Sequence, residues 1–205
     1  MTLVTHVRDS LLEAERALQA LLSNPKSLEA IARAAEVMVD SFRQGGRVFS
    51  CGNGGSMCDA MHFAEELSGR YRLNRPALAA VSISDPSHLS CVSNDYGYEF
   101  VFSRYLEAHA RAGDCLVAIS TSGKSKNVMA AVDVAKQKGV RIIGMMGSAD
   151  TPLGQAADVK IATPAGAFAD RVQELHIKAI HIMIELVERQ MFPENYAEPK
   201  ASASA

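Results

Sequence analysis

The sequence predicts an α/β fold in which helices cover both faces of a parallel sheet. From residue 47 onward, short apolar runs alternate with longer segments of helical periodicity. The apolar runs are continuous instead of alternating with polar residues, as in strands that are buried on both faces. The composition is that of an ordinary globular protein, with 48% hydrophobic and 21% charged residues in a chain of 205. A chain of this length is long enough for one well-buried domain.

Two helices are predicted before the first strand. Residues 2–22 carry apolar side chains close to a helical period, and Asn24-Pro25 interrupts the pattern. A second apolar face runs from about Lys26 to Gln44, and Gly45-Gly46 follows it as a C-terminal stop. Because these apolar stripes need a partner, we expect them to pack on the sheet or on another subunit.

The alternation that follows predicts five strands and the helices between them. The strands are expected at Val48–Cys51, Leu78–Ile83, Cys115–Ile119, Arg141–Met145 and Val159–Ile161. The helices are expected at about Met57–Gly69, Ser87–Ser93, Tyr98–Arg111, Lys126–Lys138 and Thr151–Ala156. Because crossovers between parallel strands are right-handed, the strand-to-helix turns meet at the carboxyl edge of the sheet, where a ligand is expected.

A last long helix is expected from about Ala169 to Met191. Its middle is apolar on nearly all sides, so we expect it to be buried, partly between subunits. After Phe192-Pro193 the chain turns polar, which predicts a flexible, frayed tail over residues 193–205. No repeat or linker divides the chain. Residues 1–192 are therefore expected to form one domain, with N-terminal helices over 1–46 and the α/β core and final helix over 47–192.

Charge and composition exclude several classes of function. The net charge is −2, so no overall positive field favours nucleic acid as a partner. The four cysteines have neither CxxC spacing nor the density of a disulfide scaffold. The N-terminus does not resemble a signal peptide, and no window is apolar enough to span a membrane. We therefore expect a cytoplasmic protein with no nucleic-acid partner and no membrane association.

A glycine-rich turn joins the first predicted strand to the next helix and reads Ser50-Cys51-Gly52-Asn53-Gly54-Gly55-Ser56. Such turns hold anions, because glycine lets the backbone approach the ligand and free N–H groups at the helix start point toward it. The spacing is neither the dinucleotide fingerprint nor the nucleotide P-loop. Strand–glycine–helix turns also occur as plain connections, so both interpretations remain open at this point.

A second turn, Ser120-Thr121-Ser122-Gly123-Lys124-Ser125, opens the helix that begins at Lys126. Ser125 alone fits a plain helix N-cap. Four hydroxyls around one glycine are more than a cap requires. Together with free N–H groups and the helix dipole they favour phosphate binding.

Three further groups are candidates for chemistry, and each has a structural alternative. His62 and Glu66 lie four residues apart on one helix face, either as a base or metal ligand or as an exposed pair. Gln173 and His181 share one side of the last helix, where a lone histidine is more often a core residue. Asn94-Asp95 suits sugar hydroxyls or a plain turn.

Together and in order, these motifs resemble one known family. The chain shares with the bacterial sedoheptulose-7-phosphate isomerases (phosphoheptose isomerases), of the sugar-isomerase (SIS) fold group, the segments Cys51–Ser56, Asp59–Leu67, Asn94-Asp95, Ile119–Gly123 and Gln173-Glu174-x-His176 with His181. The resemblance covers about residues 1–192. The Ser-Thr-Ser-Gly loop marks only the sugar-phosphate fold. The combination of His62, Glu66, Gln173 and His181 narrows the resemblance to this family.

The resemblance implies a three-layer αβα sandwich, the SIS domain, and a homotetramer whose active sites lie between subunits. It implies conversion of D-sedoheptulose 7-phosphate to D-glycero-D-manno-heptose 7-phosphate, the first step toward the heptose of lipopolysaccharide. The phosphate would be held by Ser120, Thr121, Ser122 and Ser125. The sugar chain would be contacted by Asn53, Gly54, Gly55, Ser56, Asn94 and Asp95.

The resemblance also implies the reacting groups. Glu66 would remove the carbon proton on the way to an enediol, and His181 would relay protons to the oxygen side. Members of the family bind Zn²⁺ through the equivalents of His62, Glu66, Gln173 and His181, which implies one zinc per subunit. Because an amide is an uncommon zinc ligand, Gln173 is expected first as a substrate contact. Glu66 is also expected to contact the substrate, besides its roles as base and metal ligand.

Two features of the sequence do not point to the catalytic members of the family. Met57 stands where relatives carry histidine or a small residue, so no side-chain role is expected there. Phe192-Pro193 is shared with a non-catalytic relative that binds the bacterial replication initiator. The alternative function is therefore a sugar-phosphate-binding or initiator-binding protein, which needs neither Glu66 nor His181. Isomerisation of another sugar phosphate is a third alternative.

Overall fold

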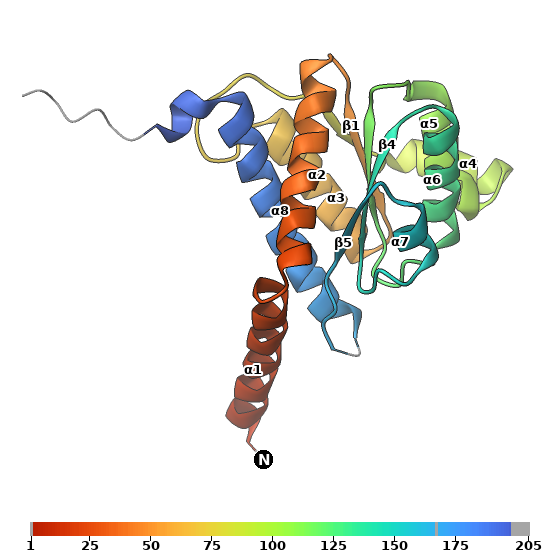
Figure 1. Cartoon of the computed structure of the whole chain (residues 1–205). Coiled ribbons are helices and arrows are strands. Elements are labelled where there is room, and N and C mark those ends of the chain that lie inside the picture. The colour runs from red at the N-terminus through yellow and green to blue at the C-terminus, as the bar shows by residue number, and fades with distance from the viewer. Residues whose placement is uncertain (1, 167, 198–205) are drawn as a thin grey trace, which may run out of the picture.

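The computed structural model describes residues 2–166 and 168–197, and these form a three-layer α/β/α structure (Figure 1). The described residues include a five-stranded, wholly parallel sheet with the strand order β2-β1-β3-β4-β5. In chain order the elements are α1 Leu3–Leu22, α2 Pro25–Arg43, β1 Val48–Gly52, α3 Gly55–Ser68, β2 Ala80–Ser82, α4 Pro86–Asp95, η1 Tyr98–Phe100, α5 Val101–His109, β3 Cys115–Ile119, α6 Lys126–Gln137, β4 Arg141–Met146, α7 Pro152–Ala156, β5 Val159–Ala162, α8 Ala169–Met191 and η2 Pro193–Tyr196. The predicted fold class is confirmed.

The sheet separates two helical layers. Along β3, Cys115, Val117 and Ile119 pack with residues of α2, α3 and α8, and the alternate residues Leu116 and Ala118 pack with α5, α6 and α7. Strand side chains point to opposite faces in turn, so one short apolar strand contributes to both cores. This explains why the strands are continuous apolar runs. Figure 1 shows the two layers on either side of the strands.

The turns that follow three neighbouring strands lie at one edge of the sheet. In the parallel register, Gly52 at the end of β1 is opposite Ile119 at the end of β3, and Ile119 is opposite Met145 near the end of β4. The two glycine- and serine-rich turns therefore begin at the same level. This places them side by side at the carboxyl edge, as the topology predicted.

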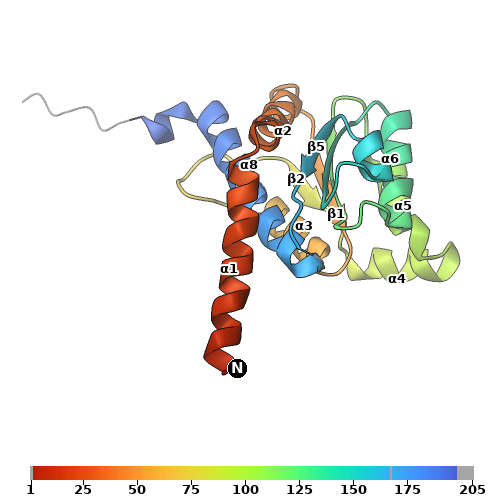
Figure 2. The same cartoon turned by 60° about the horizontal axis from the view of Figure 1, so that its bottom comes forward.

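The first two helices differ in how they pack. The Asn24-Pro25 break is the start of α2, with Asn24 Oδ1 accepting the Lys26 N–H at 3.2 Å and Pro25 as the first helical residue. α2 lies on the sheet, whereas α1 projects away from the body (Figures 1 and 2). Leu3, Val4 and Leu11 of α1 are therefore largely exposed.

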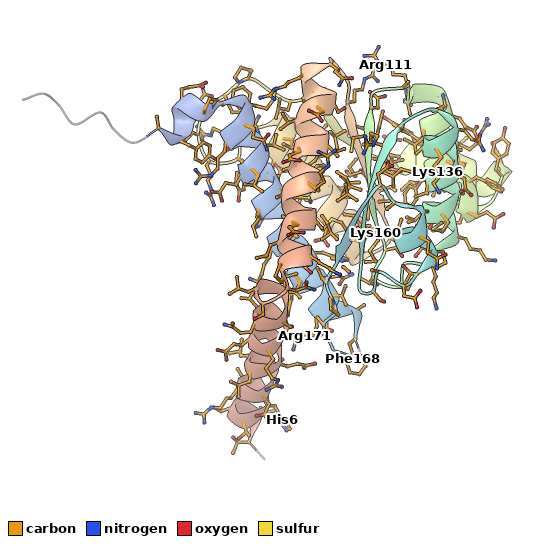
Figure 3. All side chains as sticks on the ribbon, viewed as in Figure 1. His6, Arg111, Lys136, Lys160, Phe168 and Arg171 are labelled. Carbon is orange, nitrogen blue, oxygen red and sulfur yellow. The ribbon has the colours of Figure 1, made fainter. Side chains whose placement is uncertain are left out.

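The base of α1 is tied to the start of α8. Leu21 of α1 packs against Val172 and Leu175 of α8. The Arg171 guanidinium also bonds the Ser10 hydroxyl and lies 3.5 Å from the Glu13 carboxylate. Figure 3 shows Arg171 and Phe168 at this end of α8, next to α1.

Most predicted boundaries are shifted by one to three residues, and two elements differ in a way that the contacts explain. β2 spans only Ala80–Ser82, because it is an edge strand and the Leu78 N–H donates to the Leu67 carbonyl instead of joining the sheet. The helix expected over Tyr98–Arg111 is a 3₁₀ turn followed by α5, which ends at His109.

The start of the expected tail over residues 193–205 contains a short 3₁₀ turn. Pro193–Tyr196 forms η2, and the Tyr196 hydroxyl donates to Glu188 Oε2 at 2.8 Å. The Asn195 amide also donates to the Asn74 carbonyl at 3.1 Å. Residues 198–205 of the expected tail lie outside the described residues. Among the described helices, none has both the length and the apolar content that a membrane crossing requires.

Candidate active site

The β1–α3 turn brings the backbone close to the start of α3. A side chain at Gly52 would lie 2.7 Å from the Ser56 carbonyl oxygen, so only glycine fits this tight approach. Gly54 has φ +56° and precedes the first residue of α3. No side chain caps α3, but the N–H groups of Ser56 and Met57 donate to the carbonyls of Asn53 and Gly54 at 3.0 Å. Within the described part of the chain, the Gly55 N–H is therefore the group at this helix start that is left for a ligand.

The side chain of Asn53 links this turn to the second one. Asn53 Nδ2 donates to Asn127 Oδ1 at 2.9 Å, and Asn127 Nδ2 donates back to Asn53 Oδ1 at 2.8 Å. The Tyr98 hydroxyl donates to the same Asn53 oxygen at 3.1 Å. The Asn53 oxygen is thus already occupied by protein donors. The sequence analysis missed Asn127 and Tyr98, because neither carries a recognisable motif.

The second turn gathers its hydroxyls at the start of α6. The Ser125 hydroxyl lies 3.0 Å from that of Ser120, which lies 3.4 Å from that of Ser122. Ser125 occupies the N-cap position, but its side chain does not cap α6, so the plain N-cap interpretation is wrong. The first N–H groups of α6 and three hydroxyls therefore face the same space, which suits an oxyanion.

Gly123 shapes this turn. Its φ is +64°, and a side chain here would lie 2.3 Å from the Thr151 hydroxyl oxygen. Thr151 in turn accepts the Gly154 N–H as the N-cap of α7. The serine turn is therefore packed directly against the β4–α7 turn.

A cleft of about 580 Å³ opens beside the serine turn. Thr121 and Ser122 line one side of it, and Ser148, Phe168 and Val172 line others. A smaller hollow of about 310 Å³ lies on the other flank, between Asn53, Tyr98 and Ser125. The serine turn therefore borders both spaces.

A second group of polar side chains lies where α3 faces α8. His62 Nε2 is 2.8 Å from His181 Nε2 and 3.7 Å from Glu66 Oε1. His62 Nδ1 is 3.1 Å from Glu65 Oε1, so this carboxylate favours the proton on Nδ1 and leaves the Nε2 lone pair facing His181. His62, Glu65 and Glu66 present ligand atoms that all lie within 4.8 Å of one another. Imidazole nitrogen and carboxylate oxygen are donors that suit Zn²⁺.

Burial is the main cause of the pKa shifts of two titratable groups here. Burial, together with the nearby His62, lowers the pKa of His181 below its ordinary value, which keeps this imidazole neutral near pH 7. Asp59 lies one turn before His62, and burial raises the pKa of its carboxyl to about 6. The sequence analysis missed both Asp59 and Glu65 as members of this group, since i,i+3 carboxylates are common on exposed helices.

Gln173 lies apart from this group along α8. A side chain on Gly55 would come within 2.7 Å of Gln173 Nε2, so the amide sits over the start of α3. Eight residues separate Gln173 from His181, which is about 12 Å of helix rise. The pairs Gly55–Gln173 and His62–His181 show that α3 and α8 run in the same direction. The structure thus brings three of the four predicted zinc ligands together and places Gln173 nearer the first turn.

The remaining predicted residues lie elsewhere. Asn94 and Asp95 form the exposed last turn of α4, and Asn94 Nδ2 donates to Asp95 Oδ1 at 2.9 Å. Neither side chain hydrogen-bonds to the two turns within the described part of the chain. Met57 packs against the core on the α5–α6 side, in keeping with the absence of an expected polar role.

Known proteins that resemble this chain point to one family. A family profile described as SIS domain matches residues 13–147. The phosphoheptose isomerase of Aeromonas hydrophila is 56% identical over 185 residues, which are 90% of this chain and 96% of that protein. The solved structure of the Neisseria gonorrhoeae phosphoheptose isomerase has a TM-score of 0.83 at 38% identity, over 91% of this chain and 99% of that one.

A solved structure of lower sequence identity has a similar backbone. The phosphoheptose isomerase of Francisella tularensis has a TM-score of 0.86 at 28% identity, over 92% of this chain and all of that one (100%). The sequence likeness thus spans nearly the whole of its relatives, and the backbone follows theirs. The chain belongs to the SIS-domain family and, within it, to the phosphoheptose isomerases.

Proposed function

We propose that this isomerase interconverts D-sedoheptulose 7-phosphate and D-glycero-D-manno-heptose 7-phosphate, the first step toward the heptose of lipopolysaccharide. The observation that carries the proposal is the meeting of His62, Glu66 and His181 between α3 and α8. A phosphate-binding protein has no need of a carboxylate and two imidazoles in contact. The relatives at 56% identity are phosphoheptose isomerases, which supports the same substrate here.

The phosphate binds at the second turn. The hydroxyls of Ser122 and Ser125 both lie within 3.4 Å of the Ser120 hydroxyl, and the N-terminus of α6 adds N–H groups and a favourable dipole. Thr121 lines the adjoining cleft. Asn53, Gly54, Gly55 and Ser56 contact the sugar chain, with Asn94 and Asp95 at its rim. Because Asn53 Oδ1 is occupied, its contribution comes from the backbone and the remaining amide hydrogen.

The reaction moves a proton between C1 and C2 through an enediol. Glu66 takes the carbon proton from one carbon and returns it to the other, so the base is regenerated in each turnover. His181 exchanges the matching proton between the two oxygens, and its lowered pKa lets it accept that proton near pH 7. Each positioned acid–base group of this kind typically contributes about 10²–10⁴-fold in rate.

One zinc ion per subunit fits this donor set. His62, Glu66 and His181 would hold it, and Gln173 would contact the substrate or complete the ligand set from the first turn. When bound, zinc polarises the substrate carbonyl and stabilises the negative charge that develops on its oxygen. Glu65 orients His62 through Nδ1, as outer carboxylates commonly do for metal-binding histidines.

A homotetramer with active sites between subunits is part of the proposal. Met61 and Ile182 are next to His62 and His181 in the chain, and both remain 44–48% exposed. The stripe on α1, including Leu3, Val4 and Leu11, is exposed as well. Apolar side chains beside a polar site support a second copy of this chain as their cover. Light scattering after size-exclusion chromatography measures the assembly.

A cytoplasmic location is also proposed. All four cysteines are free thiols, and two of them, Cys58 and Cys91, are exposed. Exposed free thiols are typical of a reducing compartment. Neither a membrane nor nucleic acid is proposed as a partner.

The test is turnover of purified protein with sedoheptulose 7-phosphate, followed by the appearance of the aldose. Glu66→Gln is expected to abolish turnover while the protein still binds the sugar phosphate. Glu107→Gln is the matched control, since this glutamate forms an exposed pair with Arg104 on α5. A chelator is expected to remove activity and zinc to restore it. Absence of turnover with and without zinc would favour the alternative, a binding protein.

A further inference from the structure

Arg75 is a buried arginine that holds the C-terminal end of α3. Its side chain is 1% exposed, although it lies in the loop between α3 and β2. Arg75 Nη2 donates to the Glu66 carbonyl at 2.6 Å, and Nη1 donates to the carbonyls of Leu67 and Gly69 at 2.7 and 3.0 Å. A helix C-terminus leaves such carbonyls unpaired and carries partial negative charge. The guanidinium therefore caps α3 at the residue whose side chain is the proposed base.

The same guanidinium is fixed to α8. Arg75 Nε donates to Glu188 Oε1 at 2.8 Å, and the Glu188 side chain is fully buried. The other carboxylate oxygen of Glu188 accepts the Tyr196 hydroxyl at 2.8 Å. Both charges are thus paired and hydrogen-bonded, as buried charges must be. The fork of the guanidinium makes this possible, because one group bonds two helices at once.

Glu188 lies on the His181 side of α8. The two residues are seven apart, which is close to two helical turns. The loop between α3 and β2 runs along the His181 side of α8. In this loop, the Tyr71 ring lies near the His181 ring, with centroids 5.9 Å apart, and Arg72 pairs with Glu185 of α8 at 2.9 Å. Arg75 thus sets the end of α3 against the helix that carries His181.

We infer that Arg75 is a positioning residue for the isomerisation: with Glu188 it fixes the distance between Glu66 on α3 and His181 on α8. The inference rests on the proposed function for its kinetic consequence. It does not require Arg75 to touch substrate or metal. A displacement of about 1 Å of a reacting group can lower a rate about 10²-fold, so a loosened end of α3 reduces kcat. The serine turn lies on a different strand–helix unit, so KM for the sugar phosphate changes little.

A purely structural role predicts something different. In that case a substitution lowers stability, and the protein that remains folded keeps its kcat. Asp114 supplies the matched control, because its carboxylate is fully buried and accepts the N–H groups of Arg47 and Arg111 at 2.8 and 2.9 Å. It lies just before β3, at the opposite edge of the sheet from the candidate site. Asp114→Asn is expected to lower Tm without changing kcat.

Two variants separate the roles. Arg75→Lys keeps the charge beside Glu188, but an ammonium cannot span Glu188 and the three carbonyls of Glu66, Leu67 and Gly69 at the end of α3. The double variant Arg75→Met with Glu188→Met replaces the buried pair by apolar side chains, a change that often preserves or restores stability. Both are expected to lower kcat about 10- to 100-fold with KM within about 2-fold of wild type.

Metal affinity gives a readout that does not depend on turnover. Co²⁺ is titrated into metal-free protein, and binding is followed by the visible absorption of the bound ion. Because His62 and Glu66 come from α3 and His181 from α8, the affinity depends on how the two helices are held together. Arg75→Lys is expected to weaken Co²⁺ binding about 10-fold, within the range seen when supporting contacts of a metal site are removed. Asp114→Asn is expected to leave Co²⁺ binding unchanged.

The outcomes separate the inference from the proposed function. Loss of kcat in both Arg75 variants, with Tm of the double variant near wild type, supports the inference. If both variants match Asp114→Asn in kcat and in Co²⁺ affinity, Arg75 only stabilises the fold and the inference is wrong. If wild-type protein does not isomerise the sugar phosphate, the proposed function fails. Co²⁺ affinity then decides alone, and an unchanged value in Arg75→Lys overturns the inference.

Discussion

Gly55→Ala is expected to leave the fold intact and to lower activity. Gly55 is the first residue of α3, and its φ is not in the left-handed region, so alanine fits the backbone. Alanine favours a helix over glycine by up to about 1 kcal/mol, which corresponds to a Tm unchanged or raised by roughly 2–4 °C. The new methyl group, however, would lie 2.7 Å from Gln173 Nε2 and 3.0 Å from its Cδ and Oε1.

The size of the effect follows from this overlap. Ordinary contact begins near 3.4 Å, so the Gln173 amide must move by at least about 0.7 Å. Because the amide is the end of a flexible side chain, this movement has little effect on folding. For a group that positions substrate, a shift of this size lowers kcat/KM about 10- to 100-fold. Stability and activity are thus expected to change in opposite directions.

The assay is a double-mutant cycle in kcat/KM for the sugar phosphate, with Tm measured in parallel. Gln173→Ala removes the amide, so Gly55→Ala is expected to have almost no further effect in that background. Two results would refute the reasoning. One is a Gly55→Ala protein with kcat/KM within about 2-fold of wild type, and the other is an equal loss in the presence and absence of the Gln173 amide.

Three further predictions concern the serine turn and the core. Ser125→Ala is expected to raise KM for the sugar phosphate, or the Kd for inorganic phosphate. The loss of stability is expected to be less than the roughly 1 kcal/mol of an ordinary cap removal, because the Ser125 hydroxyl bonds Ser120 and does not cap the helix. A full capping loss with unchanged phosphate affinity would contradict this. Gly123→Ala is expected to destabilise the protein by about 1–3 kcal/mol in urea unfolding, because φ is +64° and the methyl group would collide with Thr151. Burial lowers the pKa of His176 from 6.5 to about 4, so the folded protein resists the proton that the unfolded chain takes up between these values. The contribution of His176 to the free energy of unfolding is therefore complete above pH 6.5 and falls by roughly 3 kcal/mol as the pH drops to about 4. In urea unfolding at pH 7.5 and 4.5, His176→Phe is expected to remove this part of the pH dependence of stability.

The sequence predicted correctly the elements whose apolar pattern fits only one type of secondary structure. β3 and α8 begin and end where the apolar pattern places them, at Cys115–Ile119 and Ala169–Met191. β2 was predicted too long, because Leu78 is apolar and buried but bonds to α3 and not to the sheet. An apolar pattern records burial, and burial alone does not say which backbone group a residue pairs with.

The candidate site shows the same limit. The Ser-Thr-Ser-Gly turn and the His62–Glu66 spacing are local patterns, so both could be recognised along the chain. Ser125 looked like a cap because the sequence cannot show which way a hydroxyl points. Arg75 gave no signal at all, since its partner Glu188 is 113 residues away and an arginine in a loop is expected to be exposed. Contacts of this kind depend on how α3 and α8 meet.

The parallel run of α3 and α8 limits where length can change during evolution or in engineering. The two helices contact each other at Gly55–Gln173 and again at His62–His181. The segments of α3 and α8 between these two contacts must therefore keep matching lengths. One inserted residue would shift everything beyond it by about 1.5 Å along the axis and turn it by about 100°, which carries a site residue to another face. Insertions are expected to be rejected within either segment, and also directly before Gln173, where Arg171 and Val172 contact α1.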